Sequence, residues 1–109
     1  MRIAIPTIEN KVALRIRRAE GLLILDVVEG RVTSTESVGC PIRDEFDLVR
    51  VLQAYQVETL ICGRMTLEQE RAVQSLDIFV VHSAPCSVED VIRTLTGAYA
   101  TISLSRAAA

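Results

Sequence analysis

Residues 59–69 read TLICGRMTLEQ, and within this stretch a strand pattern changes to a helix pattern. Thr59–Cys62 is an apolar run of strand length that ends at Gly63. Thr66 followed by Gln69 has the spacing of a capping box, in which the two side chains satisfy backbone N–H groups at the start of a helix. The stretch therefore predicts a buried strand that leads directly into a helix.

The same transition is repeated farther along the chain. Asp77–His82 is a second strand-like run, and Ser87 can cap a helix after it. The apolar positions of that helix extend to Leu95, and Gly97 is available to end it. Two consecutive strand-helix units predict parallel strands that are joined by right-handed crossovers.

The N-terminal part of the chain has strand patterns with no helix between them. Arg2–Thr7 is interpreted as a buried strand whose apolar run is closed by Pro6, because proline cannot continue a central ladder. Leu22–Val28 and Arg31–Val38 also have strand patterns, and Glu29-Gly30 between them favours a tight turn. These two strands are expected to pair antiparallel as a hairpin.

The remaining segments complete the predicted order of elements. Lys11–Glu20 has no clean period and is interpreted as a loop or an irregular strand entry. Asp44 can cap a helix that reaches Tyr55. The order β-β-β-α-β-α-β-α predicts a mixed five-stranded sheet with helices packed against it, so the fold class is α/β.

Length and composition restrict the kind of protein. The 109 residues have the size of one domain, expected over 1–109, with 98–109 as a tail in which Tyr99–Ser105 could add an edge strand. The longest apolar runs are of strand length, and the N-terminus lacks the pattern of a secretory signal. A cytoplasmic protein without a membrane span is therefore expected. A formal net charge of −2 does not favour nucleic acid as a partner.

The predicted topology brings the cysteines and the single histidine to one edge of the sheet. Cys40 follows the third strand, Cys62 ends the fourth, His82 ends the fifth and Cys86 comes just after it. Open α/β sheets bind ligands at this edge, where the parallel strands have their carboxyl ends. Thiolates and imidazole suit zinc, copper(I) and iron-sulfur clusters, but buried cysteine often serves packing alone. Cys40 and Cys62 are expected to lie close together, which requires the loop after Gly39 to bend inward.

A basic segment leaves the same edge of the predicted sheet. Lys11–Arg18 contains four basic residues, among them Arg15 and Arg17, and Arg64 follows the fourth strand. Guanidinium groups have a suitable geometry for binding anions, so one interpretation is a cluster around a bound anion. The other interpretation is a solvated loop whose charges have no ligand.

Sequence motifs of enzymatic catalysis are missing. The sequence has no P-loop, no GxGxxG and no nucleophile elbow, and His82 has no signature serine or cysteine beside it. The carboxylates of Asp44, Asp47, Glu68 and Glu70 fit helix caps and exposed helix faces. The chain is therefore predicted not to be an enzyme.

Several stretches together resemble a known family. MRIAIPT at 1–7, RAE at 18–20 leading into LLILD at 22–26, and ICG at 61–63 before a helix are similar to the dinitrogenase iron-molybdenum cofactor biosynthesis family. That family includes NifX-like proteins and the carboxyl-terminal domain of NifB-like proteins. The resemblance extends to about residue 97 and implies a three-layer ribonuclease H-like fold with strand order 3-2-1-4-5. It also implies a protein of nitrogen fixation that carries iron-molybdenum cofactor or another metal-sulfur cluster between assembly proteins.

The resemblance also gives a candidate site with three alternatives. The family commonly has a His-Phe-Gly-Arg-Ala run where this chain has RIRRA at 15–19, and Gly-Gly where it has Gly63-Arg64. The implied cofactor-binding residues are Arg15, Arg17, Cys40, Cys62, Gly63 and Arg64. In the first alternative, Cys40 and Cys62 are metal ligands in place of histidine. In the second alternative, the arginines hold an anionic cluster or another anion by charge alone. In the third, the chain is a regulatory or interaction module that binds a small anion or a partner protein and no metal.

Overall fold

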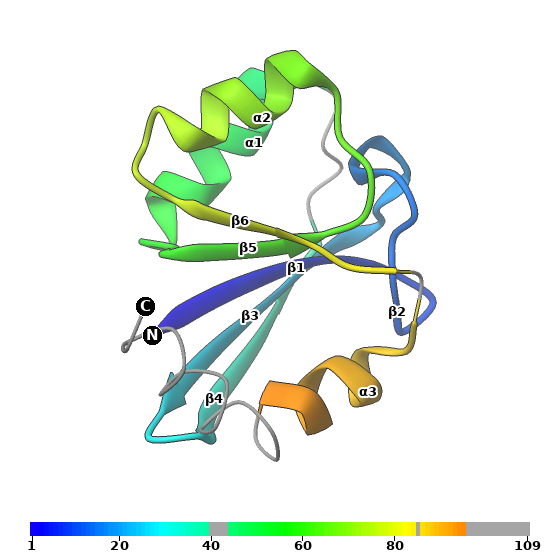
Figure 1. The fold of residues 1–109 in the computed structure, drawn as a ribbon, viewed down its shortest axis with the longest axis vertical. Coiled ribbons are helices and arrows are strands. Elements are labelled where there is room, and N and C mark those ends of the chain that lie inside the picture. The colour runs from blue at the N-terminus through cyan, green and yellow to red at the C-terminus, as the bar shows by residue number, and fades with distance from the viewer. Residues whose placement is uncertain (40–43, 85, 96–109) are drawn as a thin grey trace.

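One mixed β-sheet forms the centre of the molecule in a computed structural model, which describes residues 1–39, 44–84 and 86–95 (Figure 1). The strands are β1 (Arg2–Ile8), β2 (Lys11–Val12), β3 (Gly21–Val28), β4 (Arg31–Val38), β5 (Thr59–Cys62) and β6 (Phe79–His82). The helices are the short 3-10 turn η1 (Ile16–Arg18), α1 (Glu45–Ala54), α2 (Leu67–Gln74) and α3 (Val88–Arg93). None of these described helices is long and apolar enough to span a membrane.

The directions of the main strands agree with the prediction. The order in the sheet is β4-β3-β1-β5-β6; β3 is antiparallel to β1 and β4, whereas β5 is parallel to β1 and β6. This confirms the α/β class and the strand order 3-2-1-4-5. The predicted number of strands was wrong, because Lys11 and Val12 pair with Ile8 and Thr7 and make β2 a sixth described strand. The ribonuclease H-like assignment stays a prediction.

The expected first strand, Arg2–Thr7, is confirmed and is one residue longer in the structure, with Pro6 inside it. β1 continues through Pro6 to Ile8. Pairing of β1 with β5 is limited to Ile3 and Ala4, so the N–H group that proline lacks is not needed in that ladder. The carbonyl of Pro6 accepts a hydrogen bond from the N–H of Ala13 at 2.9 Å. A central strand can therefore contain proline at this position.

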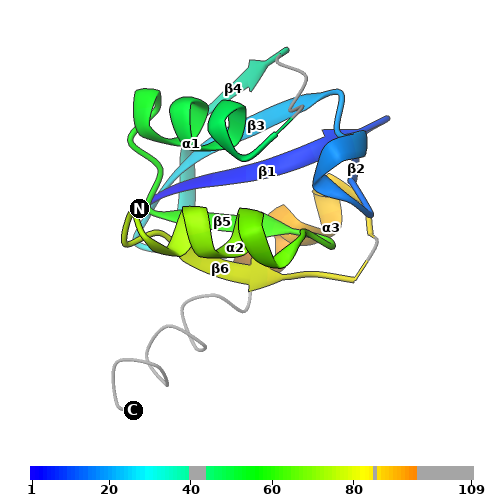
Figure 2. The same ribbon diagram turned by 90° about the horizontal axis from the view of Figure 1, so that it is seen from above.

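The helices are distributed unequally over the two faces of the sheet. α1 and α2 lie side by side on one face, and α3 lies on the other (Figures 1 and 2). The core under α1 and α2 contains Ala4, Ile24, Leu48, Leu52, Leu60, Cys62 and Val73, and the core under α3 contains Ile3, Ile5, Leu25, Ile61, Val91 and Leu95. Neighbouring strand residues thus alternate between two cores, as in a sheet that is covered on both faces.

The helix starts confirm the caps that the sequence predicts. Asp44, Thr66 and Ser87 each accept a hydrogen bond from the backbone N–H three residues on, at 2.9, 3.1 and 3.1 Å. Gln69 completes the capping box of α2 by accepting from the N–H of Thr66 at 2.8 Å. These caps determine where each loop from a strand into a helix ends. The predicted helix end at Gly97 and the edge strand after it lie outside the described residues.

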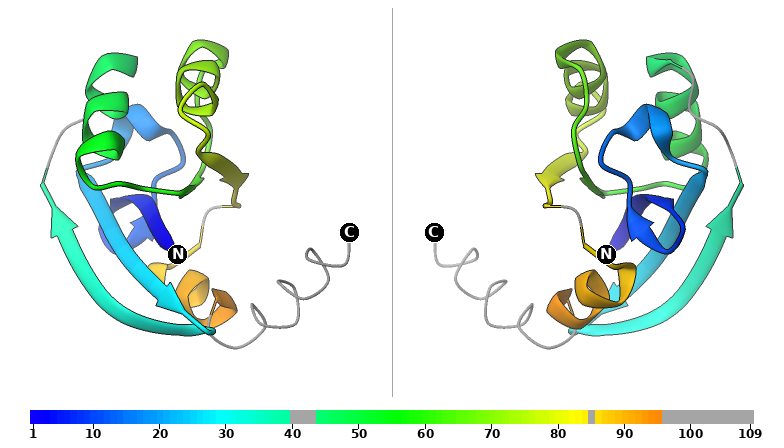
Figure 3. Two further views of the ribbon diagram at one scale, coloured as in Figure 1. Left: turned by 90° about the vertical axis from the view of Figure 1, so that its left-hand side faces the viewer. Right: turned by 90° about the vertical axis from the view of Figure 1, so that its right-hand side faces the viewer.

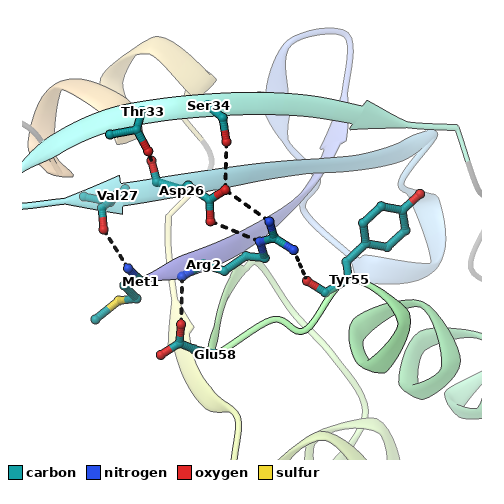
Figure 4. Close-up of polar contacts among 8 residues, drawn as sticks. All are labelled: Met1, Arg2, Asp26, Val27, Thr33, Ser34, Tyr55 and Glu58. Carbon is teal, nitrogen blue, oxygen red and sulfur yellow. Dashed lines mark hydrogen bonds and ion pairs between the residues drawn. The ribbon is translucent and has the colours of Figure 1, made fainter.

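A polar network holds the end of the sheet at which β1 begins (Figure 4). Arg2 donates to both carboxylate oxygens of Asp26, at 3.0 and 3.2 Å, and to the carbonyl of Tyr55 at 2.8 Å. Ser34 donates to the same carboxylate at 2.8 Å. The hydrogen bonds from Arg2 and then Ser34 lower the pKa of Asp26 to about 2. The network joins β1, β3, β4 and the end of α1 at the edge opposite the predicted ligand edge.

Candidate functional site

The predicted ligand edge is formed by the carboxyl ends of β1, β4, β5 and β6, which run in the same direction. At this edge the segment after β2 lies against the end of β5, and Arg15 pairs with Arg64 in an isolated parallel bridge. The N–H of Ile16 donates to the carbonyl of Arg64 at 3.0 Å, and the N–H of Arg64 donates to the carbonyl of Leu14 at 2.6 Å. Neighbouring strands lie about 5 Å apart, so two arginines that are distant in sequence are brought together here.

Gly63 allows the two segments to approach each other. A Cβ atom on residue 63 would lie 2.4 Å from the carbonyl oxygens of both Ala13 and Leu14. No side chain larger than hydrogen fits there unless the backbone of the neighbouring segment moves. Gly63 was predicted to contact a cofactor, and its role in the described structure is to admit the arginine segment against β5.

A buried isoleucine fixes the arginine segment to the body of the molecule. Ile16 is 1% exposed and packs in the core under α1 and α2. Its neighbours Arg15 and Arg17 are exposed, as is Arg64. Within residues 1–39, 44–84 and 86–95, none of these three arginines forms an ion pair. The edge therefore presents positive side chains to solvent from an anchored backbone.

Cys62, by contrast, belongs to the core. Its side chain is 0% exposed and lies in the same cluster as Leu48 and Leu60. Burial, and to a smaller extent the charge of Glu70, raises the pKa of its thiol to about 12. Its Sγ lies 3.6 Å from the Sδ of Met65. Metal ligation requires the thiolate, so the described geometry favours the packing interpretation of Cys62.

The structure does not gather the described cysteines into one group. Cys86 is half-buried and packs against the core under α3, on the face of the sheet opposite Cys62. Cys40 lies outside the described residues, so its expected approach to Cys62 stays a prediction. In the described part of the chain, no group of three or more His, Cys, Asp or Glu side chains could hold a metal ion.

His82 has a partner that the sequence analysis missed. Its Nε2 lies 2.6 Å from Oε1 of Glu70, and its Nδ1 lies 3.0 Å from the carbonyl oxygen of Gly63. Both partners are acceptors, so both contacts are hydrogen bonds only when both ring nitrogens carry protons. The hydrogen bond to Glu70, and then that to Gly63, raises the pKa of His82. Nothing in the sequence pattern marks this pair, because Glu70 also fits the exposed face of a helix.

The pairing of His82 predicts a specific dependence of stability on pH. The folded state raises the pKa of His82 above its ordinary value of 6.5, so the stabilisation is fully present below about pH 6.5 and is lost as the pH rises through the folded value. The free energy of unfolding of the wild-type chain should therefore fall relative to that of His82→Gln as the pH rises from about 6.5. Urea denaturation of both proteins at a series of pH values measures this difference.

The control for this experiment lies in the sequence itself. The chain contains no other histidine, so the substitution removes its only imidazole. A Glu70→Gln variant should show the same weaker dependence of its free energy of unfolding on pH as His82→Gln. It removes the carboxylate that pairs with the imidazole and leaves the imidazole in place. Parallel pH curves for wild type and His82→Gln would contradict the pairing.

Comparison with known proteins gives information about the fold. No protein-family model and no curated protein matches the sequence. The crystal structure of PH0822 is similar, with 23% sequence identity, a TM-score of 0.81 and coverage of 90% of each chain.

Two further solved structures are similar over most of the chain. The crystal structure of a "putative dinitrogenase" from Methanocaldococcus jannaschii is 20% identical, with a TM-score of 0.71, and covers 90% of this chain and 89% of that chain. The NMR structure of a "putative NifB protein" from Thermotoga is 23% identical, with a TM-score of 0.69, and covers 87% of this chain and 86% of that chain. At these identities the similarity establishes a shared fold.

Proposed function

We propose that this chain, which shares the fold of proteins named "putative dinitrogenase" and "putative NifB protein", is a non-catalytic carrier of an anionic metal-sulfur cofactor. The cofactor is cargo that binds at the carboxyl edge of the sheet and passes to cofactor-assembly proteins. Arg15 and Arg64 hold the cargo, and Arg17 adds a further contact. The names of the structural neighbours suggest the class of cargo, and the residues of this chain suggest where it binds.

The backbone bridge between Arg15 and Arg64 is the observation that supports this proposal best. It keeps two exposed arginines side by side at the edge where α/β sheets bind ligands. Like charges at this separation repel each other, and an anion between them converts the repulsion into attraction. Each guanidinium can donate two parallel hydrogen bonds to one anion.

Charge, and not thiolate ligation, would hold the cargo. Cys62 is buried and the pKa of its thiol is raised to about 12, and Cys86 lies on the opposite face of the sheet. Sulfide atoms of metal-sulfur clusters accept hydrogen bonds, so guanidinium groups can bind such a cluster without a metal–protein bond. A carrier of this kind can release its cargo without breaking a metal–sulfur bond to the protein.

A small oxyanion is the second candidate ligand. Arg15 and Arg64 could bind an oxyanion equally well. The burial of Cys62 removes one reason to expect a metal ion at this edge. In this case the chain is a regulatory or interaction module that binds no metal. The two candidates differ in their preference between dianions of the same shape, tetrathiomolybdate with sulfur atoms and molybdate with oxygen atoms.

The test of the proposal is the binding of tetrathiomolybdate to an Arg15→Ala/Arg64→Ala variant, measured by isothermal titration calorimetry. Hydrogen bonds to charged groups contribute about 1.5 to 3 kcal/mol each, so the dissociation constant should rise at least about tenfold. Both side chains are exposed, so the free energy of unfolding should change by no more than about 0.5 kcal/mol. Binding and stability should therefore separate.

Two control variants complete this experiment. Arg31→Ala/Arg50→Ala removes the same charge from exposed positions outside the site and should leave affinity within about twofold. Cys62→Val keeps the core filled without a thiol and should also bind as the wild type does. Unchanged binding in the arginine variant, or no binding by the wild-type chain, would contradict the proposal. Tighter binding of molybdate than of tetrathiomolybdate would favour the second candidate.

A further inference from the structure

His82 lies at the end of β6, beside the strand whose end leads to Arg64. In the sheet it pairs with Cys62, the last residue of β5, and Gly63 and Arg64 come directly after Cys62. The right-hand view of Figure 3 looks onto this edge of the sheet and shows α2 packed above β6. The imidazole therefore lies between the carboxylate of Glu70 on α2 and the carbonyl of Gly63.

The imidazole helps to hold the peptide group that joins Gly63 to Arg64. Its Nδ1 atom lies 3.0 Å from the carbonyl oxygen of this peptide group. The N–H of the same peptide group, which belongs to Arg64, donates to the carbonyl of Leu14 at 2.6 Å. A peptide group is planar, so the two contacts together fix the orientation of one rigid unit. The backbone position of Arg64 therefore depends on His82 as well as on the bridge to Arg15.

Only a protonated imidazole can keep both of its contacts. The carbonyl of Gly63 and the carboxylate of Glu70 each require a donor, and a neutral imidazole carries a single N–H. Loss of the proton therefore breaks one of the two hydrogen bonds. It also leaves the carboxylate of Glu70 without an opposite charge. The pair of His82 and Glu70 is neutral while the imidazole is protonated and carries one negative charge when it is not.

The charge of Glu70 also acts at the end of β5. After the larger effect of burial, this charge contributes to the raised pKa of the thiol of Cys62, which packs in the core. On the side of α3, the thiol of Cys86 and the carboxylate of Asp90 line a cavity together with His82, whereas the described hydrogen bonds of the ring go to Glu70 and to the backbone. An anion bound at Arg64 therefore meets the negative charge of Glu70 when the imidazole is neutral.

We propose that His82 is a positioning residue of the arginine site, and that its protonation controls how tightly the site binds anionic cargo. The control rests on the proposed function, because an anion must bind at Arg15 and Arg64 for His82 to act on it. Binding is tight while the imidazole is protonated and weaker after it loses the proton. The hydrogen bond to Glu70 raises the pKa of His82, so the change is centred above the ordinary value of 6.5. Loss of one proton then favours release of the cargo.

The test compares the binding of tetrathiomolybdate at about pH 7 and about pH 9, measured by isothermal titration calorimetry. A salt concentration of about 10 mM keeps charge interactions effective over about 30 Å. In the wild-type chain the dissociation constant should be at least about twofold higher at the higher pH, because a unit charge about 10 Å from a dianion has an effect of this size. His82→Gln should bind weakly at both pH values, because Glu70 is then never neutralised.

Glu70→Gln separates this control from a purely structural role. At about pH 9 it should bind tetrathiomolybdate more tightly than the wild-type chain does, because no carboxylate then opposes the anion. Glu68→Gln removes a carboxylate from an exposed position of the same helix and should keep the wild-type ratio of the two dissociation constants. Weaker binding by Glu70→Gln, or equal ratios in the wild type and His82→Gln, would overturn the proposal.

An NMR titration of the imidazole signals gives a second measurement on the wild-type chain, whose only histidine is His82. Saturation with tetrathiomolybdate should raise the pKa of His82, because coupling between two binding events is reciprocal. An unchanged pKa in the presence of bound anion would overturn the proposal. Binding that depends on Arg15 and Arg64 but not on His82 would overturn it and leave the proposed function intact. No binding at either pH would overturn both.

Discussion

The Gly63→Ala variant is expected to be about 3 kcal/mol less stable than the wild-type chain. The added Cβ would lie 2.4 Å from the carbonyl oxygens of Ala13 and Leu14. These are backbone atoms in a segment that Ile16 anchors in the core, so they cannot move aside as the end of a side chain could. Urea denaturation gives the free energy change. Hydrogen exchange at the amide of Ile16 should become faster, because its bond across the bridge is lost.

Gly39→Ala is the matched control for this substitution. A Cβ atom on Gly39 would have no atom within 4 Å, so the same chemical change is made without a clash. Its effect on stability should be small, within about 1 kcal/mol and favourable if the backbone suits alanine. If Gly63→Ala is as stable as Gly39→Ala, the two segments are not held as closely as the structure indicates. In addition, Gly63→Ala should weaken anion binding, because it separates Arg15 from Arg64.

The Leu48→Ala variant should lose about 3 kcal/mol of stability, within the range of about 2 to 5 kcal/mol for such truncations. Leu48 is a fully buried residue of α1 and packs in the core with Leu52 and Leu60. The helix and the sheet are both rigid, so the space left by the side chain closes only partly. The midpoint of urea denaturation should fall while its slope stays the same, because the surface exposed on unfolding hardly changes.

Phe46→Ala, on the same helix, separates burial from helix propensity. Phe46 is 74% exposed, so its removal should change the free energy of unfolding by no more than about 0.5 kcal/mol. Comparable losses in Leu48→Ala and Phe46→Ala would mean that α1 does not present the described face to the sheet.

Most of the fold could be predicted because its signals act over a few residues. Asp44, Thr66 and Ser87 marked the helix starts, since a capping side chain bonds to a backbone N–H only three residues away. The hairpin turn was also local: Glu29 and Gly30 both have positive φ, 51° and 75°, as tight hairpin turns require. The helices between β4, β5 and β6 then indicated that these strands are parallel, because a helical crossover returns the chain to the same end of the sheet.

The features that were missed depend on contacts between distant residues. Pro6 is accepted in β1 because pairing with β5 stops before it, and the sequence does not show where that pairing stops. His82 meets Glu70 only because α2 packs over β6. For Cys62, ligation and packing have the same sequence pattern, and only its burial distinguishes them. The meeting of the carboxyl ends of the strands at one edge followed from topology, whereas the pairing of Arg15 with Arg64 there did not.

The bridge between Arg15 and Arg64 also has a consequence for the speed of binding. Both backbone segments are already joined by hydrogen bonds, so an anion that arrives there immobilises two side chains and no loop. The entropic penalty is then about 0.5 to 1.5 kcal/mol for each side chain, well below that of ordering a whole segment. Association is guided by charge and needs no slow rearrangement, so its rate should be high and should fall as ionic strength rises. A site of this kind would exchange its ligand readily, as the proposed carrier function requires.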